Sequence, residues 1–208
     1  MQALIQKLKS IPKPLILAVA LVAIGLAIMI PKGRALMELT KEARYAIENN
    51  FESGNPSLDL LRPWMTLRYI ASNYGVPQKY LFDSCGIPPR KESSEIAINR
   101  LNKIMQLGQQ NNLPVLLFKV RDAIQQYKEH PVVTGLLERH VEDWMTVESI
   151  ANSTGIPADT LIKEANLPTE GSRYVPLGPL SDRVKYPGGV KALVSALENV
   201  LASHGVKP

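Results

Sequence analysis

Residues that could carry out chemistry are few in this chain of 208 residues, and they are scattered. His130, His140 and His204 do not lie at a spacing typical of metal ligands. Cys85 is the only cysteine, so an intramolecular disulfide and a multi-cysteine zinc site are both excluded. Its apolar neighbour Ile87 favours a buried thiol over a nucleophile. We therefore expect no metal, no cofactor and no catalytic group.

One short sequence has part of the pattern of a phosphate-binding loop. YPGGVK, residues 186–191, contains a glycine pair before a helical pattern, but the full glycine spacing of such a loop is absent. A helix entry is the expected structure. Paired carboxylates, a nucleophile with a base, and a nucleotide signature are likewise not found, so the chain is not expected to be an enzyme.

Arginine, lysine and tyrosine are interleaved between residues 68 and 91 and could instead bind a protein partner. Tyrosine and arginine concentrate at interface cores because they combine a large contact area with a polar tip. We predict that this region is the principal docking surface; the alternative is that its tyrosines pack against neighbouring helices. The candidate partner-binding residues are Arg68, Tyr69, Tyr74, Lys79, Tyr80, Arg90 and Lys91.

These residues belong to a sequence that occurs twice. WMTLRYIASNYGVPQKYLFDSCGIP, residues 64–88, and WMTVESIANSTGIPADTLIKEANLP, residues 144–168, are identical at nine of 25 aligned positions. In each copy a threonine can cap a helix, a glycine can end that helix in the left-handed conformation, and a proline can start a second helix. Each copy is therefore predicted to form a helix, a tight turn and a second helix. The structural repeat positions are Trp64, Gly75, Pro77, Trp144, Gly155 and Pro157.

A long amphipathic helix is predicted to end each repeat, because apolar residues recur at helical spacing in 113–127 and in 188–205. Between the helix pair and this helix, residues 93–107 are helical in pattern. The matching stretch 172–189 contains three prolines and is expected to be largely irregular. A unit this small is expected to gain a core by packing against its terminal helix and its sister copy.

The N-terminal segment indicates a membrane location. Residues 15–30 form an uninterrupted apolar run, about 24 Å long as a helix, and flanking lysines and an arginine can reach the headgroups. A cleaved signal peptide is the alternative, but the run exceeds a typical signal-peptide core and no small-x-small site follows it. We expect a single-pass anchor in the cell membrane. Basic residues on its two sides nearly balance, so the side on which the soluble part lies stays open.

The domain organisation follows from these patterns. Residues 1–34 are predicted to form the membrane anchor with an interfacial N-terminus, and residues 35–55 a stalk helix and linker. Residues 56–128 and 129–208 are predicted to form the two helical repeats. No run of alternating β-branched residues is present, so the expected class is all-α, a transmembrane helix followed by tandem helix-turn-helix-like repeats.

Three resemblances bear on function. LRYIASNYGVPQKYL resembles a helix-turn-helix, and TVESIANSTGIPADTLIKEANLP is similar to the helical core of peptidoglycan-binding LysM modules. Such modules place a strand on either side of the helix pair, and neither LLRP nor RHVED reads as one. Both copies also resemble short segments of the form MTL..IA..YGIP..LL..LGLP that are appended to bacterial membrane redox and ferredoxin-type proteins. The last resemblance implies a docking piece within a membrane assembly.

Together these features favour a non-enzymatic accessory or scaffold subunit, anchored in the bilayer, whose tandem repeats dock onto a membrane protein complex. A membrane-tethered DNA-binding regulator and a LysM-like peptidoglycan-binding protein remain the alternatives. The formal net charge of +5 is spread along the chain, and residues 144–168 carry one lysine against three carboxylates, a local charge of −2. That surface would repel phosphate, so nucleic acid is not the expected partner.

Overall fold

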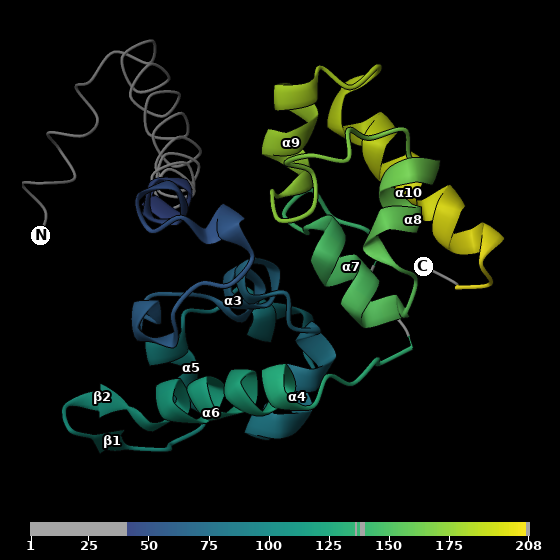
Figure 1. Cartoon of the computed structure of the whole chain (residues 1–208). Helices are drawn as coiled ribbons and strands as arrows, with labels where there is room; N and C mark the ends of the chain where they lie inside the picture. The colour runs from purple at the N-terminus through teal and green to yellow at the C-terminus, as the bar shows by residue number, and fades with distance from the viewer. Residues whose placement is uncertain (1–40, 136, 138–139, 207–208) are drawn as a thin grey trace, which may run out of the picture. The chain divides into compact units, whose positions relative to one another are not determined.

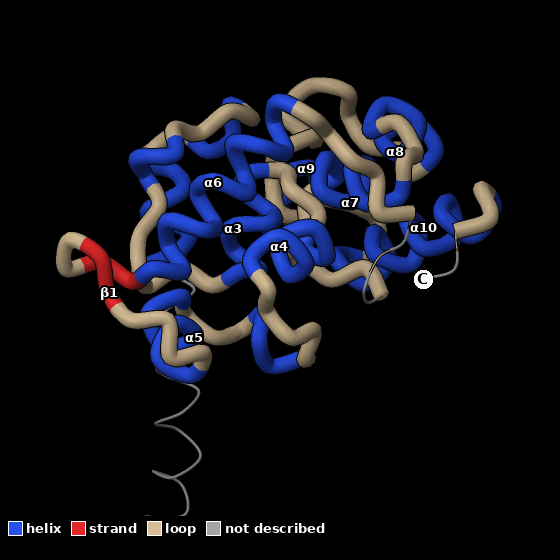
Figure 2. Tube along the Cα trace, turned by 90° about the horizontal axis from the view of Figure 1, so that it is seen from below, coloured by secondary structure: helices blue, strands red, loops and turns tan. Residues whose placement is uncertain are grey.

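The computed structural model describes residues 41–135, 137 and 140–206. The chain divides into two units, Met1–Tyr45 and Ala46–Pro208, and the elements named below belong to the second. The described part is mainly helical and contains one short two-stranded hairpin (Figures 1 and 2), which confirms the predicted helical class. The predicted anchor lies outside the described residues. Among the residues that are described, no helix combines the length and the apolar character needed to cross a bilayer.

Each copy of the repeated sequence forms the predicted helix pair. The pairs are α3 (Leu67–Tyr74) with α4 (Gln78–Cys85), and α7 (Val147–Thr154) with α8 (Ala158–Glu164). Neither residues 64–88 nor residues 144–168 contain a strand element, and each of these stretches contributes one isolated bridge residue. The prediction of two equivalent helix pairs is therefore confirmed.

The threonines and glycines begin and end these helices as predicted, whereas the prolines lie one position earlier than expected. The hydroxyls of Thr66 and Thr146 each accept a backbone N–H three residues on, at 3.1 Å. Gly75 ends α3 at φ 64°, where a side chain would be strained. Pro77 and Pro157 are the residues before the second helices and not their first residues, because their ψ angles of 131° and 136° are extended.

A third and a fourth helix complete each repeat. In the first repeat these are α5 (Ile98–Ile104) and α6 (Val115–Glu129), joined through β1 (Gln109–Gln110) and β2 (Leu113–Pro114). In the second they are α9 (Leu177–Val184) and α10 (Gly189–Ser203). The amphipathic helices predicted to end the repeats are thus α6 and α10.

The expectation that residues 172–189 are largely irregular is wrong, because α9 lies within them. Pro176 precedes the helix with φ −56°, which is suited to a helix entry. Pro179 occupies the third helical position, where the missing N–H has no intrahelical acceptor in any case. Pro187 follows the end of the helix. All three prolines therefore stand where a helix tolerates them.

A backbone tie joins the start of the third helix to the start of the first. The Ile98 amide donates to the Met65 carbonyl at 2.9 Å, and the Leu177 amide donates to the Met145 carbonyl at 2.8 Å. Isolated antiparallel bridges lie beside these bonds, at Thr66 with Ala97 and at Thr146 with Pro176. The two repeats therefore share the same closure as well as the same helices.

The core of the second repeat is its own. Its buried cluster is drawn entirely from residues 141–201, with partly buried neighbours between 137 and 206. Helix α10 supplies Leu193, Leu197 and Leu201 to it. The expectation that a repeat packs against its terminal helix is confirmed for this copy. The expectation that it also packs against its sister copy is met at the contact of α3 with α7, although no residue of the first repeat belongs to this cluster.

The segment before the first repeated sequence, residues 51–57 and called here the entry segment, is partly core. Its first five residues belong to the stretch 35–55 that was predicted to form a stalk helix and linker. The entry segment begins with η1 (Phe51–Ser53), and η2 (Leu58–Leu60) follows. Phe51 is 1% exposed and packs edge-on against the ring of Tyr74, at 5.6 Å between centroids. Its ring also lies 6.1 Å from that of Tyr69. The segment that enters the first repeat is therefore held by aromatic packing.

Replacing Phe51 by alanine tests that packing. We expect the change to lower the free energy of unfolding by about 3–5 kcal/mol, the usual cost of emptying a buried phenylalanine site. Denaturant unfolding followed by circular dichroism measures it. Ser53→Ala in the same turn is the control, since Ser53 is exposed. A Phe51→Ala loss no larger than that of the control would contradict the assignment.

Candidate docking surfaces

Two of the tyrosines predicted to face a partner lie inside the protein. Tyr69 is 6% exposed and Tyr74 is 5% exposed, so the expectation that they are surface residues is wrong. The Tyr74 hydroxyl donates to the Ser57 carbonyl at 2.9 Å, and Tyr69 packs 5.6 Å from the indole of Trp64. Both therefore hold the entry segment onto α3. Packing of these tyrosines against neighbouring elements was the alternative that the sequence left open. Tyrosine is often buried with its hydroxyl paired.

The other candidates in this region lie nearer the surface. Tyr80 is half-buried, with its ring 5.1 Å from Tyr127 on α6. Lys79 forms an ion pair with Asp83 one turn along α4, at 2.8 Å. Arg90 is exposed before η3 (Lys91–Ser94), and the side chain of Lys91 lies outside the described set. Partner binding by these residues stays a prediction.

Arg68 takes part in an ion pair that both repeats share with reversed charge. Arg68 lies 3.0 Å from Glu95, in the segment before α5. At the matching place Glu148 lies 3.1 Å from Arg173, in the segment before α9. The buried Nε and Oε2 atoms of the second pair face each other, so each serves the other. Where the first copy has Arg68 paired with Glu95, the second has Glu148 paired with Arg173. The two ion pairs therefore have opposite polarity.

Charge reversal tests this shared pair. We expect Arg68→Glu and Glu95→Arg each to lower the free energy of unfolding by about 1 kcal/mol, because like charges then face each other. The double variant should recover most of the loss. A double-mutant cycle from urea unfolding measures the coupling. Strict additivity of the two single losses would show that the pair does not interact in solution.

A polar seam joins the two helix pairs where α3 meets α7. The Ser72 hydroxyl donates to the Trp144 carbonyl at 2.8 Å, and the Thr146 hydroxyl donates to the Ser72 carbonyl at 3.3 Å. The Asn152 amide donates to the Gly75 carbonyl at 2.7 Å. Small residues let the helices come close. Trp64 and Trp144, two of the structural repeat positions, are half-buried, and Trp144 packs against the core of the second repeat.

A small cavity of about 30 Å³ lies along this seam. Gln78, Ser149 and Ser153 are among its lining residues. The side-chain nitrogen of Gln78 is buried without a protein partner. A cavity of this size holds a water molecule, which would satisfy that nitrogen. It is too small for an organic ligand.

A larger groove of about 380 Å³ opens on the second repeat beside η1. Its walls combine the apolar Ile162 and Val175 with the carboxylates of Glu52 and Asp159 and with the side chains of Arg173 and Tyr174. Arg173 also approaches Asp159 at 3.2 Å, and the neighbouring Arg183 holds Glu52 through two bonds of 2.8 and 3.1 Å. The groove thus combines an aromatic ring, apolar floor and fixed charges.

The entry segment forms one side of this groove by close contact. A Cβ placed on Gly54 would lie 2.4 Å from the ring of Tyr174, so only glycine fits beneath that ring. The φ of 80° at Gly54 also favours glycine. Sequence reasoning missed Tyr174, Arg173 and Glu52, because they come from segments about 120 residues apart that no sequence spacing relates.

The histidines and the cysteine do not come together in one site. His204 lies 3.2 Å from Glu164, and His140 lies 3.5 Å from Glu198, while His130 follows the end of α6. Within the described ranges, no group of three or more metal-binding side chains is found. The thiol of Cys85 is 1% exposed, and burial raises its pKa to about 12. A nearby lysine lowers and a nearby aspartate raises this pKa to a smaller extent.

The raised pKa makes Cys85 slow to react. At pH 8 a thiol with a pKa of about 12 is ionised in about one molecule in ten thousand, and the thiolate is the nucleophile. We expect almost no reaction with a disulfide reagent in the native protein and rapid reaction after denaturation in guanidinium chloride. Absorbance of the released thiolate measures both rates. A native rate close to that of free cysteine would contradict the burial.

Comparisons with known proteins give no relative: no protein-family model, no curated protein and no solved structure matches this chain.

Proposed function

We propose that this protein is a non-enzymatic accessory or scaffold subunit, anchored in the cell membrane, that docks through its tandem helical repeats onto a membrane protein complex. The membrane part of the proposal rests on the apolar run at residues 15–30. The repeat part rests on the recurrence of the helix pair, the threonine cap and the backbone tie in both copies.

The observation that carries the docking function is the groove between the entry segment and the second repeat. Its volume of about 380 Å³ is enough for one or two side chains of a partner segment. Tyr174 and Arg173 are of the residue types that dominate binding energy at interfaces. Ile162 and Val175 supply apolar contact, and the ion pairs of Glu52 with Arg183 and of Asp159 with Arg173 supply charged groups that can bond to polar groups of a partner.

The residues around the groove are held in place before any partner arrives. Arg183 fixes Glu52 through two hydrogen bonds, and Glu148 fixes Arg173. Preorganised side chains lose little conformational entropy on binding. These contacts restrict the side chains that surround the groove.

A LysM-like, peptidoglycan-binding role is the second candidate. The bridges of Thr66 with Ala97 and of Thr146 with Pro176 place extended backbone on either side of each helix pair, as a LysM arrangement would. Retention on purified peptidoglycan would favour this candidate. A DNA-binding role has less support, because the exposed charges of α8 are Asp159, Lys163 and Glu164.

Filling the groove tests the docking proposal. Thr169 is exposed and lines the groove, so Thr169→Trp should block it without removing a core contact. We expect the full chain, captured from gently solubilised membranes, to retain its partner complex. The Thr169→Trp variant should retain at least about tenfold less, a loss of about 1.4 kcal/mol in binding. Quantitative mass spectrometry of the captured complex measures the difference.

Asn199→Trp provides the matched control, because Asn199 is exposed on α10 and does not line the groove. It should capture as much partner as the unmodified chain. A protein that purifies alone as a monomer would overturn the docking function. Equal retention by both tryptophan variants would remove the groove as the docking site.

A further inference from the structure

The first repeat carries an element that the fold itself does not need. In the second repeat, α9 connects to α10 through the four residues 185–188. In the first, α5 connects to α6 through the ten residues 105–114, which include the hairpin of β1 and β2. Figures 1 and 2 both show this hairpin projecting beyond the neighbouring helices. Since four residues suffice for the same connection, the extra residues require another explanation.

The hairpin is built to be rigid. Asn102 is buried at its base, where its amide nitrogen donates to the Gly108 carbonyl at 2.7 Å and its oxygen accepts the Leu116 amide at 2.8 Å. The two turn residues, Asn111 and Asn112, have φ angles of 52° and 62°. Two-residue hairpin loops favour this left-handed backbone, and asparagine tolerates it. A fixed hairpin is suited to presenting its tip to a surface.

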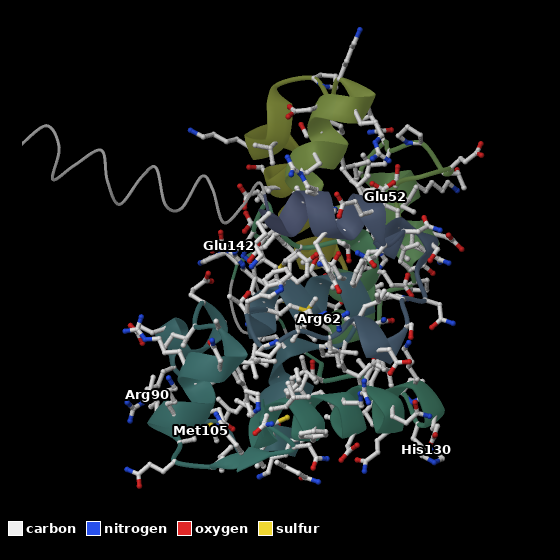
Figure 3. The ribbon with its side chains drawn as sticks, turned by 90° about the vertical axis from the view of Figure 1, so that its left-hand side faces the viewer. Glu52, Arg62, Arg90, Met105, His130 and Glu142 are labelled. Atoms are coloured by element: carbon white, nitrogen blue, oxygen red, sulfur yellow. The ribbon has the colours of Figure 1, made fainter. Side chains whose placement is uncertain are left out.

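The surface around the hairpin combines exposed apolar side chains with cations. Ile104 at the end of α5 is 58% exposed, and Leu113 on β2 is 38% exposed. Arg100 and Lys103 are exposed on the same helix within one turn of Ile104. In Figure 3 Met105, the next residue, and His130 lie on opposite sides of the lower part of the view. From residue 96 to residue 121 the chain has four basic residues and no acidic residue.

We propose that this end of α5 and the hairpin, called here the hairpin tip, binds the surface of an anionic lipid bilayer. Ile104 and Leu113 would enter the boundary between headgroups and acyl chains. Arg100 and Lys103 would lie among the phosphates, and the exposed amides of residues 109–112 would face the hydrated headgroups. Apolar side chains flanked by cations are the pattern of interfacial membrane binding.

Charge and exposure favour a bilayer over a nucleic acid or an acidic protein as the partner of the hairpin tip. A nucleic acid would use Arg100 and Lys103 but would leave Ile104 and Leu113 in water. An acidic protein would need a shaped apolar pocket to receive those two side chains on a projecting hairpin. A lipid surface accepts both kinds of side chain at once, because its charge and its apolar region lie a few ångströms apart in depth.

The proposed function supplies the proximity that a contact this small requires. If residues 15–30 anchor the chain, the hairpin tip stays close to the bilayer at a high effective concentration, so a weak affinity is sufficient. The inference rests on the proposed function in this one respect. It adds a second, reversible membrane contact that would restrict how the repeats present their groove to a partner.

A fluorescent reporter at the tip tests the proposal. The full chain carrying Gln110→Cys is labelled with an environment-sensitive dye, since Gln110 is exposed and the buried Cys85 remains unlabelled. The protein is then reconstituted into nanodiscs of phosphatidylcholine alone or of phosphatidylcholine with phosphatidylglycerol. We expect blue-shifted emission and quenching by lipid-borne nitroxides with the anionic lipid. Both signals should weaken with added salt.

Variants separate the apolar from the electrostatic contribution. Arg100→Glu with Lys103→Glu should lower the ratio of inserted to free tip by at least about 25-fold, since each basic residue near an anionic surface contributes about a factor of five. Ile104→Ser with Leu113→Ser should abolish the nitroxide quenching. The matched control is Lys185→Glu with Lys191→Glu, which makes the same charge change at exposed residues of the second repeat and should leave the signal unchanged.

Three outcomes would overturn the inference. These are emission that is the same in both lipid compositions, a charge effect of equal size from the second-repeat control, and a dye response to duplex DNA but not to lipid. Failure of the proposed function is seen separately. A chain that does not enter nanodiscs has no anchor, whereas a chain that enters but keeps a water-exposed tip lacks only the second contact.

Discussion

The backbone tie between the first and third helices is the constraint on which each repeat depends. It starts at the residue before the threonine cap, where a methionine carbonyl accepts the first amide of the third helix. The threonine hydroxyl is at the same time engaged by its own helix. Two helix starts are therefore fixed by adjacent residues, which ties the helix pair to the third helix in both copies.

Electrostatics reinforces the same place in both copies. Arg68 with Glu95, and Glu148 with Arg173, join the first turn of the first helix to the segment before the third. The charges are exchanged but the pairing is kept, because an ion pair needs opposite charges and not a particular order of them. Arg68, a candidate partner-binding residue from the sequence, therefore has an internal ion-pair partner in the structure.

The contact between the repeats has a different physical character from their interiors. The described core of the second repeat is apolar and self-contained, whereas the seam with the first is made by Ser72, Thr146 and Asn152 through hydrogen bonds to backbone carbonyls. Such bonds are directional, so they fix the register between units without requiring a large apolar area. A pair of repeats held in this way can keep a surface groove and a projecting hairpin in fixed positions.

The sequence by itself determined the helix pairs and the helices that end the repeats, because caps, glycine turns and helical spacing act over a few residues. Local patterns could not decide that Pro176 and Pro179 stand at a helix start, since that depends on where the backbone tie places residue 177. They could not separate buried from exposed tyrosine, because Phe51 reaches Tyr69 and Tyr74 from outside the repeated sequence. The groove, the seam and the inverted ion pairs join residues 25 to about 130 positions apart, so only tertiary structure decided them.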